Sequence, residues 1–280
     1  MFVRQLINEL HKLFARKRTY IGFGAFFAVQ IIILALLQLP KAKAAIDNLL
    51  TRNGYGSDEY VGGLSLGLII LKFTFVLLGA LYLALVGGDI VAKEIEDGTM
   101  RLILCRPVSR VRLMIVKWLA CMIYTITLVF FMGFSALMTG LVYRGKLGKL
   151  FVFAPEVKLF SVFDMQEGLY RYVRAVAIMA LCTMAISSVA FMFSCFRVKP
   201  AAATVLTLSC MFVDLVLYEI PYFSSYRSFF VTGHISCWVR TFDDLVPWWT
   251  VAHSLTYLAA LCATCWIIGS LRFCTLDLKG

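Results

Sequence analysis

Six long blocks of apolar residues divide this chain of 280 residues, and they constrain its fold more than any other feature. Each block holds about 20 residues or more, the length at which an α-helix crosses about 30 Å of hydrocarbon. Charged residues make up only 15% of the chain, whereas soluble domains carry about 25%. An ordinary soluble enzyme is therefore excluded, and the sequence predicts an all-α polytopic membrane protein. The six predicted transmembrane helices are residues 19–39, 64–86, 113–142, 175–196, 201–220 and 251–271.

Residues 1–18 have the pattern of an amphipathic helix that lies in the membrane interface. Its apolar positions recur at helical spacing and are Phe2, Leu6, Leu10 and Leu13. A cleaved signal peptide is the competing interpretation, because residues 42–44 form an A-x-A pattern. The apolar block before them is longer than the usual signal core of about 7 to 15 residues. We therefore expect one transmembrane domain, residues 1–280, that begins with an N-terminal amphipathic interfacial helix.

The charge distribution predicts the orientation. Six spans place both termini on one side, and basic clusters at residues 16–18 and 106–112 fall on that side. Because loops on the cytoplasmic side carry an excess of Lys and Arg, we expect both termini in the cytoplasm. The net charge of +11 then reflects orientation and anionic lipid. Nucleic acid is not expected as a partner, since no basic stripe with surface aromatics stands outside the apolar blocks.

Cysteine and histidine residues do not indicate a disulfide framework or a metal site. Within apolar blocks a cysteine behaves as a small hydrophobic residue, so no disulfide is implied there. His234 and Cys237 form an isolated pair, which is too few ligands for zinc. No set of catalytic side chains can be assembled, and we expect no metal and no catalytic residue. The cysteines inside apolar blocks are Cys121, Cys182, Cys195, Cys210, Cys262 and Cys265.

The segment of residues 89–112, after the second span, carries the most informative pattern. Gly98 can end one helix in the left-handed conformation, and Thr99 can cap the start of the next. Pro107 breaks the chain again, and Ser109 can cap the third span. The pattern predicts a short rigid helix over residues 99–105, with acidic residues before it and basic residues after it. Such an element suits docking to a cytoplasmic partner, and the alternative is an ordinary solvated loop.

At these residues the sequence resembles the ABC-2 type permeases, the membrane subunits of one class of ATP-binding-cassette exporters. The residues that carry the resemblance are Glu94, Glu96, Asp97, Gly98, Thr99, Arg101, Leu102, Leu104, Arg106, Pro107, Val108, Ser109 and Arg110, followed by Lys117. The six spans, the N-terminal helix and the short link between spans four and five also match. The outer loop, residues 143–172, is longer than the tight turn that the family pattern predicts there.

The resemblance implies the ABC-2 exporter fold and a transport function. It implies that the segment before the third span couples the permease to an ATPase subunit. The implied coupling residues are Glu94, Glu96, Asp97, Gly98, Thr99, Arg101, Arg106, Pro107 and Arg110. The implied partners are ABC ATPase subunits and a second permease copy, in a homodimer or heterodimer, within a plasma membrane or bacterial inner membrane.

The chain has no nucleotide-binding motif of the form G-x-x-x-x-G-K-[ST], the loop that holds nucleotide phosphates in a cassette ATPase. We therefore expect no cofactor in this chain, with ATP and Mg²⁺ bound by the partner ATPase. A secondary, ion-coupled transporter is one alternative, and it would place charged residues along the spans. An integral-membrane enzyme is the other, and it would need several carboxylates or histidines at one depth.

Lys72 and Asp214 are the charged residues that we single out within the predicted spans. Each lies about 9 to 12 Å below the outer end of its helix, at a rise of 1.5 Å per residue. Because a charge within the bilayer is costly, such residues usually form pairs or face water. We expect an intramembrane charge pair between Lys72 and Asp214. The alternatives are a polar point in the substrate path and a Lys72 side chain that reaches to the interface.

Residues 221–249 form an outer segment rich in aromatic residues. Aromatic side chains are typical of the boundary between membrane and water, so anchoring is the simplest interpretation. The resemblance implies an alternative, in which this segment folds back toward the outer leaflet and helps to close the exit.

Overall fold

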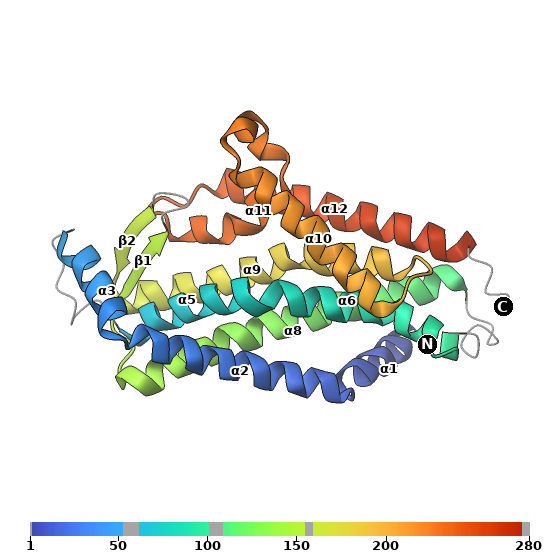
Figure 1. The fold of residues 1–280 in the computed structure, drawn as a ribbon, viewed down its shortest axis with the longest axis horizontal. Helices are drawn as coiled ribbons and strands as arrows, with labels where there is room; N and C mark the ends of the chain where they lie inside the picture. Colours follow the sequence, from blue (N-terminus) through green and yellow to red (C-terminus); the bar gives the residue numbers. More distant parts are fainter. Residues whose placement is uncertain (1, 53–61, 101–108, 155–158, 276–280) are drawn as a thin grey trace.

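The computed structural model describes residues 2–52, 62–100, 109–154 and 159–275, and it is a bundle of long helices (Figure 1). Within these residues, six helices are long and apolar enough to cross a membrane. The prediction of an all-α polytopic membrane protein is confirmed. The six helical segments are α2 (Lys17–Leu37), α5 to α6 (Gly63–Glu96), α8 (Arg110–Arg144), α9 (Met165–Ser194), α10 (Pro200–Glu219) and α12 (Trp248–Thr275).

The bundle is built around α9, the most buried of the six helices. The helices α6, α8, α10 and α12 all pack against it, while α2 lies outside α5 and α8. Figure 1 shows both chain termini at one end of the bundle, together with α1 (Phe2–Phe14). We call this the terminal end. The opposite end carries α3 (Pro40–Arg52) and the strand pair β1–β2, and we call it the hairpin end.

The second span is longer than the sequence predicts. It combines α5 (Gly63–Thr74), a π-helical turn η1 (Phe75–Gly79) and α6 (Ala80–Glu96), so it ends ten residues beyond the expected residue 86. The extension depends on a close approach at Gly87, where an added Cβ would lie 2.7 Å from the Cβ of Ala190. Residues 89–96 are therefore part of a membrane-length helix and not part of a charged loop.

Two connections at the hairpin end contain regular structure. The connection between the first two predicted spans is helical over α3, which begins at Pro40, where a helix tolerates the missing N–H. The predicted long outer loop contains β1 (Leu150–Ala154) and β2 (Leu159–Phe163), which pair antiparallel with Leu150 opposite Phe163. The helix α9 then begins ten residues earlier than expected.

The aromatic segment after α10 folds into three short helices. They are η3 (Pro221–Phe229), α11 (Val231–Ile235) and η4 (Ser236–Phe242). Residues 231–244, which we call the inserted segment, pass along α9. Thr241 contacts Arg174, and Cys237 contacts Cys182. Eight residues of α9 separate these two contacts, so the segment follows the helix for about 12 Å.

The aromatic residues of this region divide between two environments. Trp238 and Phe242 of the inserted segment are buried, at 5% and 0% exposure, whereas Tyr222 is 83% and Trp249 is 86% exposed. Burial of the first pair agrees with a segment that folds back onto the bundle. The exposed residues fit the anchoring interpretation.

Candidate functional site

The N-terminal helix α1 docks on the bundle at the terminal end. Its apolar residue Leu13 is 3% exposed and belongs to the main hydrophobic core, and α1 packs mainly on α8. The hydroxyl of Thr19 donates a buried hydrogen bond of 2.7 Å to the carbonyl oxygen of Leu13, which joins α1 to the start of α2. The expected amphipathic helix is present, and part of its polar face contacts protein.

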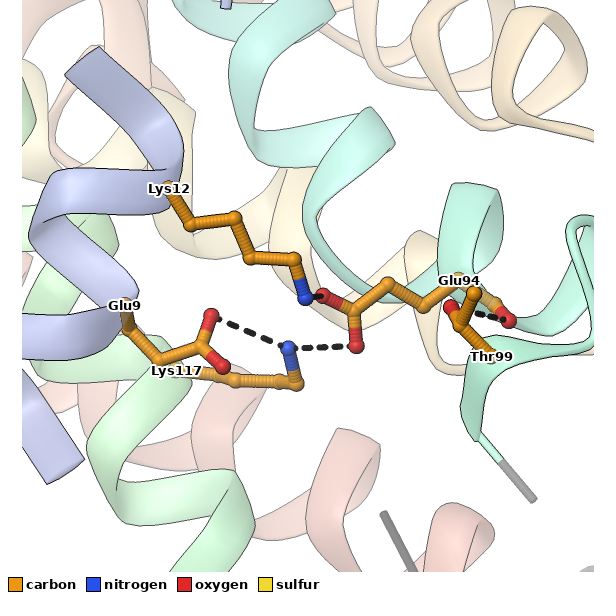
Figure 2. Close-up of polar contacts among 5 residues, drawn as sticks. All are labelled: Glu9, Lys12, Glu94, Thr99 and Lys117. Carbon is orange, nitrogen blue, oxygen red and sulfur yellow. Dashed lines mark hydrogen bonds and ion pairs between the residues drawn. The ribbon is translucent and has the colours of Figure 1, made fainter. Parts of the chain in front are cut away.

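Four charged side chains from three helices meet beside α1 (Figure 2). We call this set the ionic cluster; Glu9 and Lys12 come from α1, Glu94 from α6 and Lys117 from α8. The Nζ atom of Lys117 lies 2.7 Å from Oε2 of Glu94 and 3.2 Å from Oε2 of Glu9. Lys12 forms an ion pair with the other carboxylate oxygen of Glu94. Because its two charges of each sign balance, the cluster is neutral overall.

Two charges of the ionic cluster are buried, so the stability of the protein depends on their ion pairs. The side chain of Lys117 is fully buried and that of Glu94 is 4% exposed, while Lys12 is 41% exposed. A buried charge without a partner is strongly destabilising, because it loses hydration and gains no Coulomb attraction in return. Lys117 and Glu94 therefore depend on each other and on α1. The sequence prediction missed Lys117 as a third charge within the spans, although it interrupts the apolar block of residues 113–142.

The end of α6 matches the sequence prediction at Gly98. This residue has φ = +72°, the left-handed conformation that ends a helix and favours glycine. The hydroxyl of Thr99 lies 3.3 Å from the carbonyl oxygen of Glu94 and donates a hydrogen bond to it. Thr99 thus satisfies a free carbonyl at the end of α6. Glu96 and Asp97 are exposed beside this turn.

The start of α8 also matches its prediction. The Ser109 hydroxyl accepts a hydrogen bond of 3.4 Å from the backbone N–H of Arg112, as a helix cap does. The guanidinium of Arg110 donates to the carbonyl oxygen of Cys274 at 3.0 Å, which links α8 to the last turn of α12. Three predicted coupling residues, Arg101, Arg106 and Pro107, lie outside the described residues, as does most of the short helix expected over residues 99–105.

Asp214 of α10 has well-defined hydrogen-bond partners at the start of α11. One carboxylate oxygen accepts from the N–H of Val231 at 3.1 Å, and the other accepts from the N–H and the hydroxyl of Thr232, both at 2.7 Å. Asp214 therefore caps α11 from a neighbouring helix. No signal in the sequence indicates this contact, because the partners are identified only by the packing of α11 on α10.

The axial alignment of α6 and α10 determines how far apart Lys72 and Asp214 lie along the bundle. The two helices run antiparallel, and an added Cβ on Gly88 would lie 3.0 Å from Oγ1 of Thr204. Counted from this contact, Asp214 lies level with residue 78, so Lys72 is about 9 Å further along the axis toward the hairpin end. The pairing of Lys72 with Asp214 stays a prediction, which the substitutions described below test.

His234 is held by hydrogen bonds and by stacking. Its Nε2 donates to the carbonyl oxygen of Ser228 at 2.9 Å, its Nδ1 lies 3.1 Å from the Ser254 hydroxyl, and its ring stacks on Tyr257. Cys237 contacts Cys182 instead of forming a ligand pair with His234. Among the residues that the structure describes, no group of three or more His, Cys, Asp or Glu side chains could hold a metal ion.

These features define an integral membrane protein with six spans, whose interfacial helix is fastened to the spans by buried charges. Comparison with protein families agrees with this class. The family model for the ABC-2 family transporter protein matches residues 7–235, which is well over half of the chain. The chain therefore belongs to the ABC-2 transporter family and is a transport permease. A comparison with curated proteins found no match.

Proposed function

We propose that the chain is the permease subunit of an ABC exporter, driven by ATP that a separate ATPase subunit hydrolyses. Membership of the ABC-2 family carries the proposal, and the geometry of the terminal end supports it. The proposed docking surface consists of the exposed residues Glu96 and Asp97, the Gly98 turn and the segment that leads to Ser109. With a second permease copy, two such surfaces would receive two ATPase subunits.

The absence of a nucleotide loop from the sequence supports a separate ATPase. The nearest approach to the motif is Gly140-Leu-Val-Tyr-Arg-Gly145-Lys146, but Leu147 stands where a Ser or Thr would bind Mg²⁺. It also lies at the C-terminal end of α8, where free carbonyl groups repel phosphate, and not at a helix N-terminus. An added Cβ at Gly140 would lie 2.4 Å from the carbonyl oxygen of Gly63, so its backbone is packed against α5.

The ionic cluster gives the proposed docking surface a rigid connection to the spans. Glu94 lies one turn before Gly98, and Lys117 lies two turns after Ser109. Their ion pair therefore joins the end of α6 to the start of α8, on either side of the segment between them. Glu9 and Lys12 connect α1 to α6 and α8 through the other ion pairs of the cluster. The hydrogen bond from Thr19 to Leu13 connects α1 to α2. A displacement of the docked ATPase would therefore move α2, α6 and α8 together, whereas a flexible loop would absorb it.

The charge pattern supports a cytoplasmic terminal end. Exposed basic side chains at this end include Arg4, Lys17, Arg197 and Lys199. Loops with such an excess of Lys and Arg stay in the cytoplasm. The terminal end would then face the compartment that supplies ATP.

The test compares coupling variants with matched controls at the hairpin end. Gly98→Val places a β-branched residue at φ = +72°, which costs about 1 to 2 kcal/mol, although an added Cβ would meet nothing within 4 Å. Gly145 has φ = +68° and the same open space, so Gly145→Val is the control. Glu96→Lys reverses an exposed charge at the proposed surface, and Asp47→Lys on α3 does the same at the other end.

Each protein is expressed in its native host and purified from the membrane, and the co-purified ATPase and its hydrolysis rate are measured. The purified permease alone should not hydrolyse ATP. Gly98→Val and Glu96→Lys should each lower ATPase recovery or activity several-fold with unchanged insertion, and the two controls should resemble the wild type. Equal recovery and activity in all five proteins would show that the segment is a solvated loop. Purification of the wild-type protein without any ATPase would make an ion-coupled transporter the better proposal.

A further inference from the structure

Two buried thiols from distant parts of the chain touch each other in the bundle. Cys182 lies within α9 and Cys237 lies in η4, 55 residues later, and their sulfur atoms are 3.4 Å apart. Both residues are nearly inaccessible, with exposures of 0% and 2%. The sequence gives no hint of this pair, because Cys182 fits an apolar block and Cys237 lies in an aromatic segment.

Hydrogen bonds on both sides of Cys237 hold η4 against α9 and so keep the two sulfur atoms close together. The guanidinium of Arg174 donates to the carbonyl oxygen of Thr241 at 2.9 Å, and that of Arg171 donates to the carbonyl oxygen of Asp243 at 2.6 Å. These bonds fix the C-terminal end of η4 on α9. At the other end, His234 is held by Ser254 of α12. Cys237 lies between these anchors, so its distance from Cys182 is set by packing.

A disulfide bond requires sulfur atoms about 2.0 Å apart, so the two thiols need to approach by about 1.4 Å. The pKa of the Cys237 thiol is lowered, chiefly because Cys182 can donate a hydrogen bond to its sulfur, with a further contribution from the charge of Arg240. The thiolate is the form that attacks an oxidant. We assign Cys237 as the initial nucleophile because it lies in η4, outside the membrane-length helices and near the charge of Arg240, and Cys182 within α9 as the resolving thiol.

We propose that Cys182 and Cys237 are a redox-active dithiol that a hydroperoxide converts to a disulfide, which fastens the inserted segment to α9. The Cys237 thiolate attacks one peroxide oxygen, the O–O bond breaks, and hydroxide leaves, which gives a sulfenic acid. The Cys182 sulfur then attacks the Cys237 sulfur, and the sulfenic oxygen leaves as water once protonated. Two thiols and one hydrogen peroxide give one disulfide and two waters.

The burial of the pair selects the oxidant. A thiol–disulfide exchange requires the attacked disulfide to reach the sulfur in line, and a glutathione molecule or a protein oxidant is too large for thiols with at most 2% exposure. Hydrogen peroxide is uncharged and little larger than water. Cys274 is partly exposed in the last turn of α12, at the terminal end, and offers an internal comparison that both reagents can reach.

The physical consequence is a change in the freedom of the inserted segment. In the reduced protein, hydrogen bonds and packing hold residues 231–244, and such segments open locally at a free energy below that of global unfolding. A covalent bond in the middle of the segment removes the open states in which η4 leaves α9. The proposal concerns this dithiol alone and does not depend on the proposed transport function.

The test uses the full chain, purified in detergent under reducing conditions and then treated with hydrogen peroxide or with oxidised glutathione. Peptide mapping without reduction should find Cys182 linked to Cys237, with a loss of two hydrogens, after peroxide only. Oxidised glutathione should modify Cys274 and leave the pair reduced. Hydrogen exchange of residues 236–242 should slow several-fold on oxidation.

Substitutions separate the pair from general oxidation. Cys182→Ser should abolish the link and leave a sulfenic acid at Cys237, which a dimedone probe traps, whereas Cys265→Ser removes another buried thiol and should leave the link unchanged. The measurement on the wild-type protein decides the proposal even where a variant fails to fold. Sulfinic acid at Cys237 without a Cys182 link would overturn the proposal, as would a link that leaves hydrogen exchange unchanged.

Discussion

The ionic cluster at the terminal end and the inserted segment near the hairpin end are both held by buried polar groups, but in different ways. In the ionic cluster, side chains of regular helices pair with one another, with Lys117 between Glu9 and Glu94. The inserted segment is held through its backbone groups, which form hydrogen bonds with the side chains of Arg171 on α9 and Asp214 on α10. Arg171 also forms an ion pair with the exposed Glu167 of α9. The difference follows from secondary structure, because long helices satisfy their own backbone, while short helices leave N–H and C=O groups free.

This difference predicts how each region responds to the loss of one polar side chain. Loss of the buried Lys117 or Glu94 from the ionic cluster leaves a buried charge without that partner, which affects the whole bundle. Loss of a backbone partner leaves neutral groups that water can reach once the segment opens, so the effect is smaller and local. Three substitutions test this contrast, from the largest expected effect to the smallest.

Lys117→Met should have the largest effect. The methionine fills a similar volume but leaves Glu94 and Glu9 facing each other, and breaking a buried ion pair costs about 3 to 5 kcal/mol. The measurement is the thermal midpoint of the purified protein in detergent. Lys12→Met is the control within the cluster, because Lys12 is 41% exposed and a pair of that kind is worth about 1 kcal/mol or less.

Combining Lys117→Met with Glu94→Gln should recover part of the lost midpoint, since it removes the buried charge of Glu94, which would otherwise have only the half-exposed Lys12 as its partner. If Lys117→Met is no less stable than Lys12→Met, the ionic cluster does not support the bundle, and the proposed rigid connection loses its basis.

Arg171→Met should have an intermediate and local effect. The Arg171 guanidinium donates to the carbonyl oxygens of Thr241, Asp243 and Asp244 and lies 4.0 Å above the ring of Phe163. Its removal should cost about 2 to 3 kcal/mol, because hydrogen bonds to a charged group are worth more than neutral ones. Hydrogen exchange should accelerate over residues 236–244 and stay unchanged in α1.

Arg174→Met is the matched control for this substitution. Arg174 donates one hydrogen bond to Thr241, so the acceleration should be smaller. Equal acceleration in α1 and in the inserted segment would mean that the segment is part of the same cooperative unit as the ionic cluster, and the contrast would fail.

Asp214→Asn should have the smallest effect. The amide oxygen of Asn can still accept a hydrogen bond at the start of α11, whereas Asp214→Ala removes the cap and should cost about 1 kcal/mol. Thermal midpoints of the two variants test this order. If instead Asp214 pairs with Lys72, Asp214→Asn and Asp214→Leu should both lower folded yield, and Lys72→Met should restore it in the double variant.

The sequence determined the parts of this protein that depend on local chemistry. The six spans follow from apolar blocks, because each helix satisfies its own backbone and needs only enough apolar length to cross the membrane. The turn at Gly98 and the Ser109 cap were predicted for the same reason, since each depends on the conformation or hydrogen bonding of neighbouring residues. The end of the second span at residue 86 was predicted wrongly, because the charges of residues 89–96 concealed a helix that Gly87 allows to pack against α9.

Only the tertiary structure decided which polar groups meet. Glu9 and Lys117 are 108 residues apart, and Arg171 reaches Asp243 across 72 residues. The sequence shows that Lys117 interrupts an apolar block. A buried lysine needs an oppositely charged partner, but the sequence does not identify that partner. The partner is selected by the register and rotation of packed helices, to which many side chains contribute. The same packing places Cys182 against Cys237 and Asp214 against the start of α11.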